Sequence, residues 1–216
     1  MLEVHWQNRK KKGDDAMSDM IPSPITENQI GKMNEIFSAK LRKAELQSGP
    51  VQQVLEYRGG QLAVDLLAVV QQHVDAESTM ISRNTVVDRF LSPQQALEAT
   101  GRKQYLANNV VKTMSNGKGD KAEVFFFNLG CWISDDDLGK EYVKRGLVPC
   151  DSHTLSKVNQ DDPTFADDHP NCTYWKDGDG RWCFAIFFCW LGERRVYVYH
   201  DDDDWDGAWW FAGVRK

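Results

Sequence analysis

The sequence lacks the features of a membrane or secreted protein. No apolar run approaches the roughly 20 residues that a membrane-spanning helix needs, and no apolar segment follows the basic residues near the N-terminus. Its five cysteines are an odd number, which is typical of free thiols in a reducing compartment rather than of a disulfide framework. These absences predict a cytoplasmic protein without a membrane segment.

The sequence also lacks the short motifs that identify common enzyme classes. It contains no G-x-S-x-G nucleophile elbow, no H-E-x-x-H zinc helix, no phosphate-binding G-x-x-x-x-G-K-[ST] and no strand-linked G-x-G-x-x-G. Many active sites assemble from scattered residues, so this absence does not exclude an enzyme. It does favour a non-enzymatic protein.

What the sequence has is enough apolar surface for a packed core, at 41% hydrophobic residues, and an uneven distribution of charge. Residues 149–216 hold 13 Asp and Glu against 7 Lys and Arg, so this segment alone accounts for the net charge of −6. It also holds 14 of the 24 aromatic residues. Because an acidic surface repels phosphate backbones, direct nucleic-acid binding is disfavoured and the functional surface is expected in this segment.

Three regions are expected along the chain. Residues 1–20 include a short basic run with little to bury, which predicts a flexible tail. Residues 21–78 have apolar side chains at helical spacing and predict a helical unit. Residues 79–216 mix strand and helix patterns and end in a predicted antiparallel β-meander. The fold class is therefore expected to be α+β.

Several local signals place the helices within these regions. Thr26 and Gln29 have the spacing of a capping box, and Ser92 with Pro93 is a second helix start. The acids after Ser134 suit the first turn of another helix. Gly59-Gly60 predicts a break or kink in the N-terminal unit.

The acidic segment that follows His200 raises the question of a cation site. Asp202, Asp204 and Asp206, followed by a glycine, have the alternation of the first half of an EF-hand loop, in which carboxylates converge on calcium. An EF-hand loop ends in a glutamate that binds calcium through both oxygens, but here that position is Gly213. The segments on either side of the loop have strand patterns rather than helical ones. A solvated hairpin loop is the competing interpretation. Asp177 to Gly180 has a similar but weaker pattern, for which a turn is sufficient.

A second candidate metal site combines two Cys/His pairs. Cys150 and His153 form one pair and His169 and Cys172 the other, each with two intervening residues and with fifteen residues between the pairs. Four such ligands can close a tetrahedral zinc site. The ligand order is unusual, and histidines beside aspartates are often surface or capping groups, so ordinary structural roles remain the alternative.

The same acidic region also suggests a surface for recognition. Asp201 and Asp203, together with Trp205, Trp209 and Trp210, can form a negative face in which tryptophans act as anchors for a partner with a basic surface. The preferred hypothesis is therefore a non-enzymatic binding protein that uses an acidic, tryptophan-rich C-terminal face. A metal-dependent enzyme, such as a hydrolase, and a metal-stabilised structural protein are the alternatives.

Segments across much of the chain resemble a group of uncharacterised bacterial proteins. They are residues 50–55 (PVQQVL), 101–105 (GRKQY), 174–183 (YWKDGDGRWC) and 209–216 (WWFAGVRK). The resemblance implies a bacterial or mobile-element origin. It implies no activity, cofactor or catalytic residue.

Overall fold

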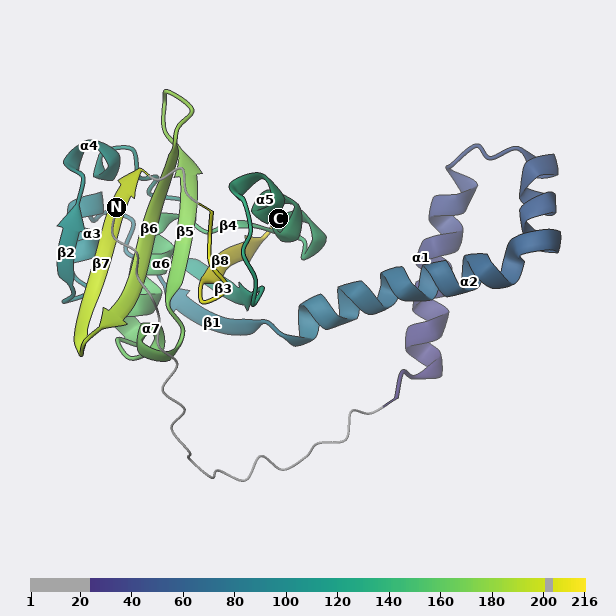
Figure 1. Ribbon diagram of the computed structural model, residues 1–216, viewed down its shortest axis with the longest axis horizontal. Helices are drawn as coiled ribbons and strands as arrows, with labels where there is room; N and C mark the ends of the chain where they lie inside the picture. The colour runs from purple at the N-terminus through teal and green to yellow at the C-terminus, as the bar shows by residue number, and fades with distance from the viewer. Residues whose placement is uncertain (1–23, 201–203) are drawn as a thin grey trace. The chain divides into compact units, whose positions relative to one another are not determined.

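The computed structural model describes residues 24–200 and 204–216 (Figure 1). The predicted tail at residues 1–20 and the aspartates at 201–203 lie outside the described residues. The chain divides into two compact units, residues 1–60 and 61–216. None of the described helices is both long and apolar enough to cross a membrane.

Two helices, α1 (Glu27–Arg42) and α2 (Ser48–Ser78), account for the predicted helical region. The capping box at the start of α1 is confirmed: the Thr26 hydroxyl accepts a hydrogen bond from the Gln29 backbone N–H, and the Gln29 side chain accepts one from the Thr26 N–H. Of the two predicted outcomes at Gly59-Gly60, a break does not occur, because α2 continues through both glycines for 31 residues. Two glycines cost about 2 kcal/mol relative to alanine, which a long helix can absorb.

The α+β prediction is confirmed by the second unit, in which short helices accompany a mixed eight-stranded sheet (Figure 1). The strands are β1 (Ile81–Val86), β2 (Lys103–Leu106), β3 (Lys121–Asn128), β4 (Leu147–Pro149), β5 (Asn171–Lys176), β6 (Trp182–Trp190), β7 (Glu193–His200) and β8 (Trp210–Arg215). The helices are α3 (Pro93–Glu98), α4 (Asn108–Val111), α5 (Asp135–Lys144), α6 (Ser152–Asp161) and α7 (Phe165–Asp168). The strand order is β1-β3-β8-β5-β6-β7-β2, with β4 also beside β8.

The expected C-terminal meander is confirmed for β5, β6 and β7, which pair antiparallel and lie side by side in Figure 1. The last strand leaves that meander. β8 inserts between β3 and β5, where it runs antiparallel to β3 and parallel to β5. Phe211 and Ala212 thereby enter the centre of the sheet, and both are buried.

Alternation of side chains along the strands builds two cores. On β6, Cys183, Ala185 and Phe187 belong to the cluster packed beneath α3, α4, α6 and α7. The intervening residues Phe184 and Ile186 belong to the second cluster, which α5 covers through its own apolar side chains. Since the two clusters use alternate residues of the same strands, each core lies on one face of the sheet.

Gly213 in β8 lies so close to its neighbours that a larger side chain at this position is expected to lower stability. A Cβ atom at this position would lie 2.9 Å from Tyr142 Cε1 and 3.0 Å from the Val148 carbonyl oxygen. The Tyr142 ring cannot easily retreat, because its hydroxyl donates a hydrogen bond to the Ala212 carbonyl at 2.9 Å. We expect Gly213→Ala to lower the free energy of unfolding by about 1–3 kcal/mol, measured by urea denaturation.

Gly139 in α5 provides the matched control for this substitution. Its Cβ would lie 4.0 Å from the Tyr174 hydroxyl, which is ordinary van der Waals contact. Alanine is favoured over glycine within a helix by about 1 kcal/mol, so Gly139→Ala is expected to raise stability. An increase in stability for both variants would contradict the close approach at Gly213.

Candidate functional site

The face of the sheet that carries α5 is only partly covered. Side chains of β6, β7 and the segment before β8 that pack against its core are half-buried rather than buried: Trp182, Trp190, Tyr197, Tyr199 and Trp209. We call these five residues the aromatic face. Tyr105 of the edge strand β2 extends it, with its ring 4.6 Å from that of Tyr197 and 38% of its surface exposed.

Three cationic side chains near the aromatic face, among the described residues, are already engaged. The Lys176 ammonium lies 4.3 Å from the centre of the Trp182 ring, which is a cation–π distance. Lys103 donates a hydrogen bond of 2.9 Å to Glu193, and this bond raises the pKa of the Lys103 ammonium. Arg195 also donates a hydrogen bond to Glu193, at 2.8 Å.

The three tryptophans of the predicted partner-binding surface occupy different environments. Trp205 is only 6% exposed, and its indole N–H donates a 2.9 Å hydrogen bond to Asp135. Trp210 packs against the opposite core, with its ring 4.9 Å from that of His169. Trp209 is the only one of the three that belongs to the aromatic face. Asp201 and Asp203, from the same prediction, lie outside the described residues.

The residues of the predicted calcium loop are described only in part. Asp202 lies outside the described residues, and Asp204 is exposed. The Asp206 carboxylate accepts a 2.8 Å hydrogen bond from the Ala208 N–H, which shapes a local turn. Gly207 is held close to Gly130, because a Cβ at 207 would lie 2.6 Å from the Gly130 carbonyl carbon. The turn is therefore anchored to the protein, and calcium binding stays a prediction.

The four predicted zinc ligands are not brought together as one cluster. Cys150 and Cys172 belong to different core clusters, and both are buried. The two ring nitrogens of His153 face the carbonyl oxygens of Ser115 and Leu91, at 3.3 and 3.1 Å. His169 stacks on Phe165 with ring centres 4.9 Å apart.

A different set of metal-ligating side chains converges at the end of the β5–β6 hairpin. Asp177, Cys183 and His200 each place one ligand atom within 4.8 Å of the other two, and they are the one such group of three or more among residues 24–200 and 204–216. Asp177 begins the hairpin turn, Cys183 lies in β6 and His200 ends β7. In the sequence, Asp177 is recognisable only as a turn residue. The β6–β7 register pairs Cys183 with His200, and this register cannot be read from the local sequence around Asp177.

The Asp177 carboxylate is held in place by a dense set of donors. One oxygen accepts hydrogen bonds from the backbone N–H groups of Asp179 and Arg181, at 2.9 and 3.0 Å. The other accepts from the Arg181 guanidinium at 3.0 Å. Burial by itself would raise the pKa of Asp177, but these hydrogen bonds outweigh it and hold the pKa below its usual range. The carboxylate is therefore ionised and oriented.

Cys183 is the most enclosed member of this cluster. Its residue surface is fully buried, and its sulfur lies 3.4 Å from His200 Nδ1. Burial raises the pKa of the Cys183 thiol. A Cys/His nucleophile requires an accessible thiolate, so the cluster does not have the character of a hydrolase site.

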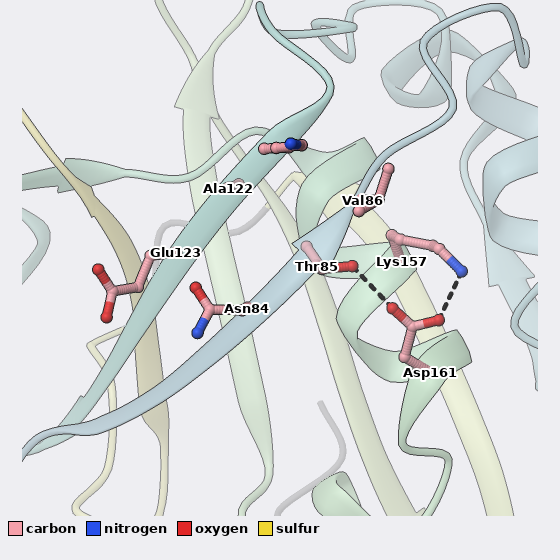
Figure 2. Close-up of a pocket in the computed structure, with 8 residues that line it drawn as sticks. Asn84, Thr85, Val86, Ala122, Glu123, Lys157 and Asp161 are labelled. Atoms are coloured by element: carbon pink, nitrogen blue, oxygen red, sulfur yellow. Dashed lines mark hydrogen bonds and ion pairs between the residues drawn. The ribbon is translucent and has the colours of Figure 1, made fainter.

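An open pocket of about 560 Å³ lies apart from these groups, beside β1, β3 and α6 (Figure 2). Three of its polar side chains bond to one another: the Thr85 hydroxyl donates a 2.7 Å hydrogen bond to Asp161, and Lys157 pairs with the same carboxylate. Burial would raise the pKa of Asp161, but its bonds to Lys157 and Thr85 prevail and the pKa is lowered. The acid and the amine neutralise each other, which suits a structural role.

No protein-family model, curated protein or solved structure matches this chain.

Proposed function

We propose that this chain is a non-enzymatic binding protein whose aromatic face, together with the acidic segment that follows β7 in the sequence, receives a basic segment of a protein partner. The observation that carries the proposal is the gathering of half-buried tryptophan and tyrosine side chains on one part of the sheet. Single exposed apolar residues are ordinary, whereas a contiguous group of large aromatics is typical of an interaction surface.

The composition of the aromatic face suits protein recognition. Tryptophan and tyrosine are enriched among the residues that contribute most to binding, because each buries a large rigid surface at little entropic cost. The underlying β6 and β7 strands are well ordered by eight register pairs, so the face is largely formed before a partner binds. Preorganisation of this kind reduces the entropic cost of association.

Charge favours a basic partner. Asp204 is exposed, and the run of aspartates at 201–204 directly follows β7, the strand that supplies two tyrosines of the face. The protein's own cations at this surface are paired with Glu193 or lie over aromatic rings. Arginine or lysine from a partner can therefore meet the aspartates while its aliphatic stem or guanidinium covers aromatic rings.

The proposal is tested by charge reversal with a defined probe. A synthetic peptide that alternates arginine and leucine is titrated against the protein by calorimetry, at low and at high salt. We expect binding to the wild type that weakens as salt rises, and at least about a tenfold loss of affinity in the Asp202→Lys, Asp204→Lys double variant, since a basic partner then meets like charge.

A second double reversal separates a local site from net charge. Glu98→Lys with Asp168→Lys makes the same change in charge, but on α3 and α7, which cover the opposite face of the sheet. We expect this variant to bind the peptide as the wild type does. An equal loss in both double variants, or no binding of the peptide by the wild type, contradicts the proposed function.

A further inference from the structure

We propose that Asp177, Cys183 and His200 form a binding site for a divalent ion of the Zn²⁺ class, with a remaining coordination position for water. The inference is independent of the proposed binding function. It rests on the convergence of one oxygen, one sulfur and one nitrogen ligand from three different points of the β5–β6–β7 meander.

The hydrogen bonding of His200 determines which ring nitrogen is available. Nδ1 lies 3.0 Å from the Trp182 carbonyl oxygen, and a carbonyl can only accept, so Nδ1 carries the proton of that bond. In the neutral ring Nε2 then holds a lone pair. A histidine that donates one N–H to a backbone carbonyl and offers its other nitrogen is the usual arrangement of a metal ligand.

The group that faces His200 Nε2 is an acceptor as well. Nε2 lies 3.6 Å from the Asp177 carboxylate oxygen. A metal ion placed between the two atoms can bind both. Their separation fits such an ion, because it is close to the ~3.4 Å that separates nitrogen and oxygen ligands on tetrahedral zinc.

The donor set selects the type of metal. Thiolate, imidazole and carboxylate together suit zinc, a borderline-soft ion, whereas calcium and magnesium prefer oxygen ligands alone. Binding converts the Cys183 thiol to a thiolate and releases its proton to solvent. Three protein ligands are fewer than the four of a closed structural zinc site and leave room for a water molecule.

A second layer of contacts supports the ligands. The backbone N–H groups and the guanidinium that bond Asp177 orient its carboxylate. The Thr113 hydroxyl lies 3.9 Å from the Cys183 sulfur and itself accepts a 2.9 Å hydrogen bond from the Trp175 indole. Such outer partners commonly fix the geometry of metal ligands. A bound ion would tie the hairpin turn to His200, the residue directly before the acidic segment.

The site is tested by titrating metal-free protein with Zn²⁺ and, separately, with Co²⁺. We expect one zinc ion per chain by calorimetry and a thiolate-to-cobalt charge-transfer absorption, which reports a Cys ligand directly. Asp177→Asn keeps a side-chain oxygen that can accept the turn hydrogen bonds. This variant and His200→Gln should each lower zinc affinity at least about tenfold. Cys183→Ser should abolish the charge-transfer absorption. Circular dichroism establishes that each variant is folded.

His169→Gln is the matched control, because it removes a ligand of the Cys/His set that the sequence suggested and leaves the proposed site intact. We expect this variant to bind zinc as the wild type does. Loss of zinc in His169→Gln with retention in Asp177→Asn would overturn the proposal, as would wild-type protein that binds neither ion. If Cys183→Ser fails to fold, absence of the cobalt charge-transfer absorption in the wild type overturns the thiolate assignment.

Discussion

Replacing Trp205 by alanine is expected to lower the free energy of unfolding by about 3–5 kcal/mol, as for other buried large-to-small substitutions. The indole packs edge-to-face against Phe184 and Phe211, with ring centres 4.8 and 5.5 Å away. Its removal leaves a cavity between the sheet and α5, and Asp135 loses the hydrogen bond from the indole N–H. Urea denaturation followed by far-ultraviolet circular dichroism measures the loss without depending on Trp205 fluorescence.

Two further variants serve as references for the Trp205→Ala result. Trp132→Ala removes a tryptophan that is 72% exposed and should change stability by less than about 0.5 kcal/mol. Trp205→Phe keeps an aromatic ring but removes the N–H donor, so it should lie between the two. If Trp205→Ala were as mild as Trp132→Ala, Trp205 would be a surface residue and again a candidate anchor for a partner.

Arg102→Ala is expected to lower the free energy of unfolding by about 3 kcal/mol, because it removes the donor for several buried acceptors. The Arg102 guanidinium is buried and donates hydrogen bonds to the carbonyl oxygens of Phe188 and Pro163, at 3.3 and 2.9 Å, and to the Asn159 side chain at 3.2 Å. It thereby links β6 to the end of α6. Burial lowers the pKa of Arg102, an effect that nearby Asp167 partly offsets.

The control for Arg102 is another arginine at the same edge of the protein. Arg194 pairs with Asp167 at 2.7 Å, but its side chain is 40% exposed. Solvent-exposed ion pairs contribute about 0–1 kcal/mol, so Arg194→Ala should have a small effect in the same denaturation experiment. Equal losses for the two variants would show that the hydrogen bonds of Arg102 add little beyond those of a surface arginine.

Local chemistry made parts of the fold predictable. Ser92 caps α3 with Pro93 at the first helical position, as predicted, and Ser134 caps α5 with three aspartates in the first turn. These features depend on residues three or four positions apart, whose interactions the backbone geometry of a helix dictates. The β5–β6 turn is predictable for the same reason, since Gly180 adopts the positive φ that the turn requires.

The candidate sites were less accessible to sequence reasoning. Trp205 looked like a surface anchor because it follows a run of aspartates, yet the bridge between Trp205 and Ile133 draws it into the core. Asp177 and His200 are 23 positions apart in the sequence, and nothing in their local spacing indicates that they meet. The Cys150 and Cys172 pairs had suggestive spacing but lie in different core clusters.

Composition and short-range pattern determined the α+β class, the helix starts, the β5–β6–β7 meander and the concentration of acids and aromatics near the C-terminus. Tertiary structure decided the insertion of β8 between β3 and β5, the separation of Trp205, Trp209 and Trp210 into three environments, and the meeting of Asp177, Cys183 and His200. The physical reason is that strand register and packing depend on contacts between residues distant in sequence. A one-residue difference in register moves a side chain to the other face of the sheet.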